Sequence, residues 1–199
     1  DATAVEEEDA QLITYLGTNI VKEFVRRNID PNLAKLDETM LANVNIQQNC
    51  NAYFDGQSIN FFKSSSECEN TGRLEDVIYH EYGHNLHVFE IIEGVGSFDG
   101  AMSEGVSDFL AASITNDSGM GRGFFKDDDP LRELNPVDRE NMYPRDIAGI
   151  HTTGIIYGGT FWDLRTTLME QLGPEAGQAL VLKLYTATLR RSTSIPASL

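Results

Sequence analysis

The sequence lacks any run of about 18 consecutive apolar residues, so no segment is predicted to insert into a membrane. Basic residues are also scarce, because 15 Lys and Arg stand against 31 Asp and Glu and leave a formal net charge of −16. A surface this acidic repels phosphate backbones, which argues against nucleic acid as a partner. The same acidity fits a highly soluble, secreted protein.

Cysteine is almost absent, since only Cys50 and Cys68 are present, on either side of a segment with strand character. A bridge between them would stabilise the fold by about 3 kcal/mol in the chain-entropy account. Two buried free thiols are the alternative, and the sequence leaves both open. The chain opens at Asp1 with an acidic run and without a charged-then-apolar signal segment. We therefore expect residues 1–199 to be one domain excised from a longer secreted precursor.

The apolar periodicity predicts an α+β domain, with a strand-rich part and a long helix in residues 1–90 and a mostly helical part in residues 91–199. The expected helices are 5–27, 73–89, 101–114, 147–172 and 175–190, and the expected strands are 44–46 and 52–62, with a turn at Asp55 and Gly56. Residues 116–143 are rich in Gly, Pro and Asp and predict a long irregular segment. Within it, residues 127–129 are either a solvated acidic loop or calcium ligands.

The segment His80-Glu81-Tyr82-Gly83-His84 carries the clearest chemical signal, on the helix expected after Gly72. Residues four apart on a helix differ by about 40° around its axis, so both imidazoles face one point and can bind one Zn²⁺. Glu81 lies about 100° further round and is poorly aimed to be a ligand. It is instead placed to take a proton from a metal-activated water.

A catalytic zinc site needs a third protein ligand as well as an open position. Glu104, on the next expected helix, can supply the carboxylate. Asp108 lies one turn later on the same face and can accept the free N–H of a ligand histidine, which would fix its tautomer.

His87 is the alternative third ligand by residue type, because it shares a helix face with His80 and His84. One straight helix, however, would string three ligands along a line instead of surrounding an ion. A packing or supporting role is therefore favoured for His87. Glu90 and Glu93, which follow it, are expected to face solvent.

The remaining histidine, His151, follows Asp146 by five residues. A lone histidine is usually structural, but here Asp146 could orient the ring and keep it protonated. A protonated ring would donate to the anionic intermediate that zinc-assisted hydrolysis develops.

These motifs together resemble the gluzincin metallopeptidases of the thermolysin and fungalysin type, over about residues 51–165. His80, Glu81 and His84 match two zinc ligands and the general base of that family. Glu104 matches its third zinc ligand, with nineteen residues between it and His84.

Further positions extend the resemblance. Asp108 matches the family's acid behind a zinc ligand, and Asp146 and His151 fall at its spacing for the transition-state histidine and the acid that orients it. The segment at residues 160–165 is closer to the fungalysin branch, so the superfamily is assigned and the branch stays open.

The resemblance also implies binding roles outside the metal site. Asn51 and Ala52 match an edge strand that binds the substrate backbone, and Asp76 matches an acidic position that binds calcium in thermolysin-like enzymes. There are departures as well. Val95 stands where the thermolysin branch has the tyrosine that is its second oxyanion donor, so that donor is not expected here. Thr115 stands where another calcium-binding acid is expected, so Asp76 alone carries the prediction of Ca²⁺ as a cofactor beside Zn²⁺.

The resemblance implies a thermolysin-like zincin catalytic domain, with the active-site helix between its two parts. The implied activity is that of a secreted, extracellular zinc-dependent endopeptidase, which hydrolyses internal bonds of a peptide or protein substrate with metal-activated water. A gluzincin aminopeptidase is disfavoured, because its Gly-Ala-Met-Glu-Asn-like strand is absent. The alternative is a catalytically silent or structural zinc-binding domain of the same fold, against which intact Glu81 argues. Cleavage preference and oligomeric state stay open.

Overall fold

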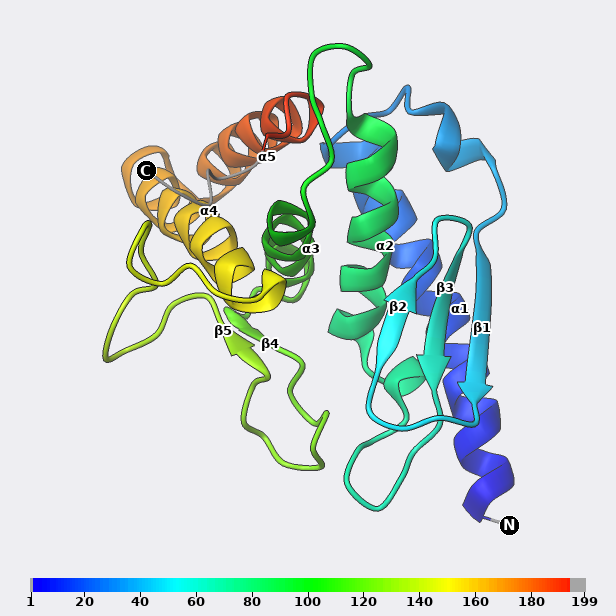
Figure 1. Cartoon of the computed structure of the whole chain (residues 1–199). Coiled ribbons are helices and arrows are strands. Elements are labelled where there is room, and N and C mark those ends of the chain that lie inside the picture. Colours follow the sequence, from blue (N-terminus) through cyan, green and yellow to red (C-terminus); the bar gives the residue numbers. More distant parts are fainter. Residues whose placement is uncertain (1, 194–199) are drawn as a thin grey trace.

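The computed structural model describes residues 2–193 and has the α+β architecture that the sequence predicts (Figure 1). The α-helices are α1 (Ala2–Asn28), α2 (Glu75–Glu90), α3 (Gly100–Thr115), α4 (Ile150–Leu172) and α5 (Pro174–Arg190). The strands are β1 (Leu41–Ile46), β2 (Ala52–Phe54), β3 (Ser58–Phe62), β4 (Gly119–Met120) and β5 (Arg132–Glu133), and single 3-10 turns form at Ala34–Asp37 and Thr71–Arg73. No helix in residues 2–193 is both long enough and apolar enough to span a bilayer.

The elements follow the predicted order, but β1 begins three residues earlier than expected, and the short strands β4 and β5 form within the segment predicted to be irregular. The predicted turn at Asp55 and Gly56 is confirmed and divides the segment 52–62 into β2 and β3: the Asp55 carboxylate accepts hydrogen bonds from the Gln57 and Ser58 amides, and Gly56 takes a φ of 95°. The helix expected at 147–172 begins only at Ile150. There the Ala148 amide donates to Thr153 Oγ1, so residues 147–149 form a cap instead of a helical turn.

The main sheet has the strand order β1-β3-β2, with β1 parallel and β2 antiparallel to β3. β2 is therefore an edge strand, and it lies alongside α2 on the side that faces the helical part (Figure 1). Its free edge leaves backbone N–H and C=O groups that an extended peptide could pair with.

α2 lies in the middle of the molecule and packs against α1 on one side and α3 on the other. Gly83 allows the close approach of α3, because a Cβ at that position would lie 2.8 Å from the Cα of Ser107. Gly105 does the same between α3 and α4, where a Cβ would lie 2.9 Å from the Gly158 amide nitrogen. The aromatic side chains of Phe109 and Tyr185 fill the core beside these contacts.

Glu90 is buried, so the expectation that it faces solvent was wrong. The end of α5 returns to the ends of α1 and α2, where Arg190 Nε donates to Glu90 at 2.8 Å and Arg190 Nη2 donates to Asp30 at 2.5 Å. This pairing offsets the cost of burying the carboxylate. Glu93 is exposed, as expected.

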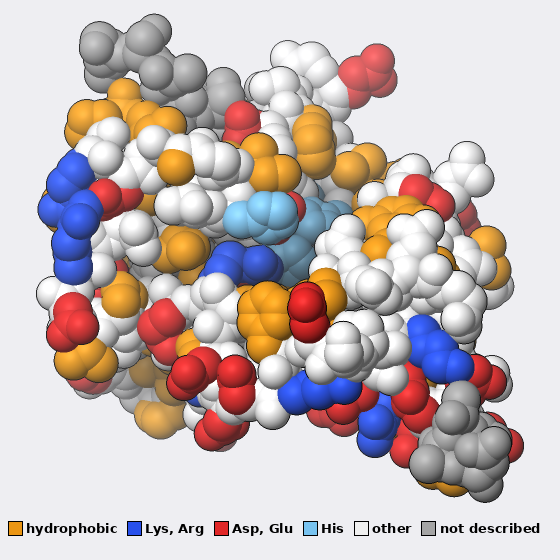
Figure 2. Space-filling model, turned by 60° about the horizontal axis from the view of Figure 1, so that its bottom comes forward, with side chains coloured by type: hydrophobic (Ala, Val, Ile, Leu, Met, Phe, Trp, Pro, Cys, Tyr) orange, Lys and Arg blue, Asp and Glu red, His pale blue; other side chains and the backbone are white. Residues whose placement is uncertain are grey.

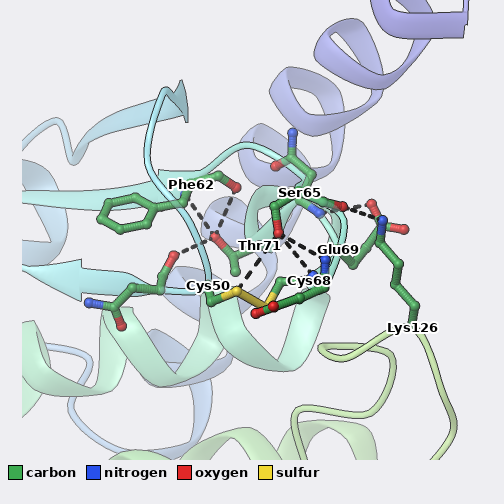
Figure 3. The surroundings of a disulfide bond; sticks show 10 residues. Cys50, Phe62, Ser65, Cys68, Glu69, Thr71 and Lys126 are labelled. Carbon is green, nitrogen blue, oxygen red and sulfur yellow. Dashed lines mark hydrogen bonds between the residues drawn. A yellow bond between two sulfur atoms is a disulfide. The ribbon is translucent and has the colours of Figure 1, made fainter.

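A disulfide joins Cys50 and Cys68, whose Cα atoms are 5.3 Å apart, so the alternative of two free thiols does not hold (Figure 3). Next to the bridge, Thr71 Oγ1 donates to the carbonyl of Asn51 and accepts from the amide of Phe62. These bonds fix the residues that lead into the edge strand β2.

Candidate metal centre and active-site cleft

Three side chains from α2 and α3 converge on one point. His80, His84 and Glu104 each offer one ligand-type atom, and these atoms all lie within 4.8 Å of one another. His80 Nε2 is 3.3 Å from Glu104 Oε2, and His84 Nε2 is 3.8 Å from Glu104 Oε1. Two imidazole nitrogens and one carboxylate form a donor set that suits a divalent transition metal, with zinc foremost.

The position of each histidine follows from local sequence. The spacing of four residues puts both rings on the face of α2 that meets α3. Gly83, between them, lets α3 approach closely enough for Glu104 to reach the same point.

Both histidine rings are held through their Nδ1 atoms, which leaves Nε2 turned towards Glu104. His80 Nδ1 lies 2.6 Å from Asp108 Oδ1, and His84 Nδ1 lies 2.8 Å from Ser103 Oγ. Such contacts fix the tautomer and orientation of a metal-binding imidazole.

Arg132, on β5, is a site residue that sequence analysis missed. Its Nε and Nη2 donate to the two oxygens of Asp108 at 2.6 and 2.7 Å. Burial would raise the pKa of Asp108, but the Arg132 guanidinium and the His80 ring outweigh burial and hold it well below the usual range. Asp108 is therefore a fixed negative charge behind His80. Arg132 lies in the irregular segment 116–143, where no spacing pattern points to it.

The protein surroundings shift the pKa values of His80 and His84 in opposite directions. Burial would lower the pKa of His80, but Asp108 outweighs it and raises that pKa to about 10. Burial, reinforced by the charge of His80, lowers the pKa of His84 to about 3. Binding a metal ion therefore requires His80 to lose a proton, whereas His84 is ready as a neutral ligand.

Glu81 lies beside the three converging residues and is 5% exposed. Its burial raises its pKa to about 7. Among the described residues, Glu81 Oε2 has no hydrogen-bond partner. A carboxyl group with this pKa, facing a cleft, can take up and release a proton near neutral pH.

His151 is at the start of α4, at the rim of the same site. Its Nε2 is 3.4 Å from Glu104 Oε1, and its side chain is 61% exposed. The structure does not bring Asp146 onto this ring as expected. The Asp146 carboxylate accepts instead from the Met142 amide at 2.8 Å and from the guanidinium groups of Arg139 and Arg145. Two nearby arginines outcompete the ring for this carboxylate, so Asp146 shapes the loop before α4.

Two further predicted residues serve structural contacts. Asp76 Oδ1 accepts from the Val77 amide and Oδ2 from the Gly121 amide, which ties the start of α2 to β4. His87 Nε2 lies 2.8 Å from Ser192 Oγ, and its ring packs against Phe98, away from the other two histidines. The acidic residues 127–129 are exposed on their loop.

A hollow of about 450 Å³ opens over the converging side chains. Asn51 and Ala52 at the edge strand line it on one side, Arg132 lines another, and His151 stands at its rim. Figure 2 shows histidine side chains gathered in and over this hollow, beside a basic side chain and with apolar side chains around them. The cleft therefore combines a metal-type donor set, a buried carboxyl group and a free strand edge.

No family model matches the sequence, and no curated protein matches it. Among solved structures, the chain is similar to the precursor of protealysin, a metalloproteinase from Serratia proteamaculans, with a TM-score of 0.66 and 18% sequence identity. The similarity covers 96% of this chain and 68% of that one. It confirms the predicted fold, a thermolysin-like α+β domain with a helical C-terminal part.

Proposed function

We propose that this chain is a zinc-dependent endopeptidase that hydrolyses internal peptide bonds, with His80, His84 and Glu104 as metal ligands and Glu81 as general base. The observation that carries the proposal is the convergence of the three ligand-type atoms within 4.8 Å, beside a buried carboxyl group. The likeness to a metalloproteinase precursor supports a protease-type hydrolase.

The residues present fit a zinc ion. Two Nε2 atoms and one carboxylate would leave a position open for water or substrate, as catalytic zinc sites do. When bound, zinc supplies Lewis acidity, which lowers the pKa of a water molecule and polarises a carbonyl group. Asp108, held by Arg132, would keep the His80 ring in its ligand orientation.

Glu81 would move the proton in this reaction. Its buried carboxylate would take a proton from the attacking water and later pass it to the leaving amine. Its pKa of about 7 suits both steps, because the group can exist in either protonation state near neutral pH.

The rim residues would position the substrate. An extended peptide would pair with the free edge at Asn51 and Ala52, which would lay its scissile carbonyl across the cleft. His151 would donate a hydrogen bond to the carbonyl oxygen as negative charge develops there.

The proposal includes an extracellular location. The Cys50–Cys68 disulfide supports this, because such bonds persist mainly in oxidising compartments. Zinc is the cofactor proposed here. Calcium at Asp76 stays an untested prediction, and in the structure each oxygen of that carboxylate accepts one backbone hydrogen bond.

The test is zinc content together with cleavage of a quenched fluorescent peptide library, with and without 1,10-phenanthroline. We expect one zinc ion per chain, chelator-sensitive cleavage of internal bonds, and loss of activity by several orders of magnitude in Glu81→Gln with zinc retained. Glu170→Gln makes the same chemical change on the exposed face of α4 and should behave as wild type.

Wild-type turnover by Glu81→Gln would overturn the mechanism. Stoichiometric zinc without cleavage by the wild type would instead favour the silent or structural zinc-binding domain.

A further inference from the structure

The loop between α2 and α3, residues 91–99, continues the cleft beyond the metal ligands. It forms one wall of a second hollow of about 490 Å³, lined by Val88, Ile91, Phe98 and other loop residues. Val88 and Phe98 also line the hollow over the metal site, so these two side chains border both hollows. These two side chains are 40% and 57% exposed, which leaves an apolar surface directly beside the cleft.

The loop is anchored by specific contacts. The Ser97 amide donates to the carbonyl of Ser192 at 2.7 Å, and the Ile92 amide donates to the carbonyl of Arg190 at 3.1 Å. The Phe98 ring packs on the buried His87 ring, with centroids 5.5 Å apart, and His87 is itself bonded to Ser192. Phe98 is therefore held over the cleft by the chain that follows α5, and a preorganised apolar side chain is what a selective pocket needs.

The axis of α2 gives the distance of this surface from the metal site. Val88 lies six residues beyond the midpoint of His80 and His84, which is about 9 Å along the helix. An extended peptide rises about 3.4 Å per residue, so this span corresponds to roughly three residues.

The edge strand gives the direction of the bound peptide. β2 runs in the same direction as α2 (Figure 1). A peptide that pairs antiparallel with β2 would therefore place the residues before its scissile bond near Val88 and Phe98, and the residues after it near Arg132.

We propose that Val88 and Phe98 form a subsite that selects an apolar side chain two or three residues before the scissile bond. This inference rests on the proposed peptidase function and names the substrate feature that the cleft reads. Glu93, which also lines the second hollow, adds repulsion against an acidic side chain at that position.

The test compares cleavage-site profiles of a peptide library for the wild type, Phe98→Ser and Phe98→Leu. The selected position is the residue two or three before the scissile bond. We expect the wild type to cleave peptides with Leu at this position with a kcat/KM about tenfold higher than peptides with Ser. Phe98→Ser should lose most of this ratio, and Phe98→Leu should keep it. Tyr15→Ser removes another exposed aromatic side chain, from α1, and should leave the ratio unchanged. An unchanged ratio in Phe98→Ser, or a preference found only after the scissile bond, would overturn the subsite.

A separate binding measurement distinguishes this inference from the proposed function. Fluorescein-labelled peptides with Leu or Ser at the selected position are titrated against zinc-loaded Glu81→Gln, with and without Phe98→Ser, and followed by anisotropy. A Leu preference that depends on Phe98 supports the subsite even if the wild type cleaves nothing, whereas equal binding of both peptides rejects it. Absent cleavage by the wild type rejects the peptidase function alone.

Discussion

His80 and His151 both reach the Glu104 carboxylate, yet they stand in opposite surroundings. The His80 side chain is 5% exposed and is backed by the buried pair of Asp108 and Arg132. The His151 side chain is 61% exposed at the rim, and the expected contact with Asp146 is replaced by the arginine contacts of that carboxylate. The comparison teaches that protein contacts hold the His80 ring from behind, whereas the His151 ring at the rim is largely exposed to solvent.

The largest expected effect comes from Asp108→Asn, which removes the buried negative charge behind His80. The change leaves the Arg132 guanidinium without its partner and removes the anion behind His80. We expect a loss of about 3–5 kcal/mol in the free energy of unfolding. Zinc affinity should fall by about 10–100-fold.

Denaturant unfolding and zinc competition against a chelator measure these two losses. Asp163→Asn, at an exposed position on α4, is the matched control and should change neither quantity. If Asp108→Asn kept the stability and the zinc affinity of the wild type, the Asp108 carboxylate would not be what supports the His80 ring.

His151→Gln acts on the exposed side of the comparison. We expect kcat/KM to fall by about 10²–10³-fold, because one donor to the developing oxyanion is lost. Stability should stay within about 0.5 kcal/mol of wild type, since the ring is on the surface. Peptide kinetics, zinc content and thermal unfolding are measured on one preparation, and loss of zinc in this variant would place His151 in the metal centre instead.

The buried ring of His87 should make stability depend on pH. Burial lowers its pKa from 6.5 to about 4. Above pH 6.5 the ring is neutral in both folded and unfolded chains, and below that pH only the unfolded chain gains a proton. His87 should therefore cost about 3 kcal/mol of stability as the pH falls from 6.5 to 4.

His87→Gln keeps a hydrogen-bonding group near Ser192 but cannot titrate. Denaturant unfolding of both proteins between pH 7 and pH 4 should give a smaller pH dependence for the variant. Parallel curves would show that His87 does not titrate in this way.

Gly83→Ala is expected to have the smallest effect. A methyl group at this position would press on the Ser107 backbone and side chain, and such overpacking costs about 1–3 kcal/mol. Zinc affinity should fall as well, because α2 and α3 carry the ligands on either side of the contact. Gly149→Ala, which adds a methyl group in open space, is the control for unfolding and zinc titration. If Gly83→Ala and Gly149→Ala had the same stability and zinc affinity, α2 and α3 would not be closely packed at Gly83.

Sequence analysis predicted the features that depend on short spacing. His80 and His84 are four residues apart, which is one helical turn, and Glu104 lies on the following helix. This spacing predicted that the three side chains meet at one point. The α+β class followed in the same way from apolar periodicity.

Two of the features that sequence analysis missed depend on contacts between distant segments. Arg132 reaches Asp108 from an irregular segment, and Glu90 is buried because Arg190, a hundred residues later, pairs with it. Asp146 lies five residues from His151, but nearby arginines take its carboxylate. Tertiary packing brings in Arg132 and Arg190, and local pattern gives no signal for it. Arg139 and Arg145 are instead close to Asp146 in the sequence and pair with it locally.

The most direct test of the central claim is a crystal structure of the zinc-loaded protein with anomalous diffraction data collected at the zinc edge. The account predicts one strong peak about 2.0–2.1 Å from the Nε2 atoms of His80 and His84 and in contact with the Glu104 carboxylate, with Glu81 unbound. A peak held by other residues, or no peak between α2 and α3, would contradict it.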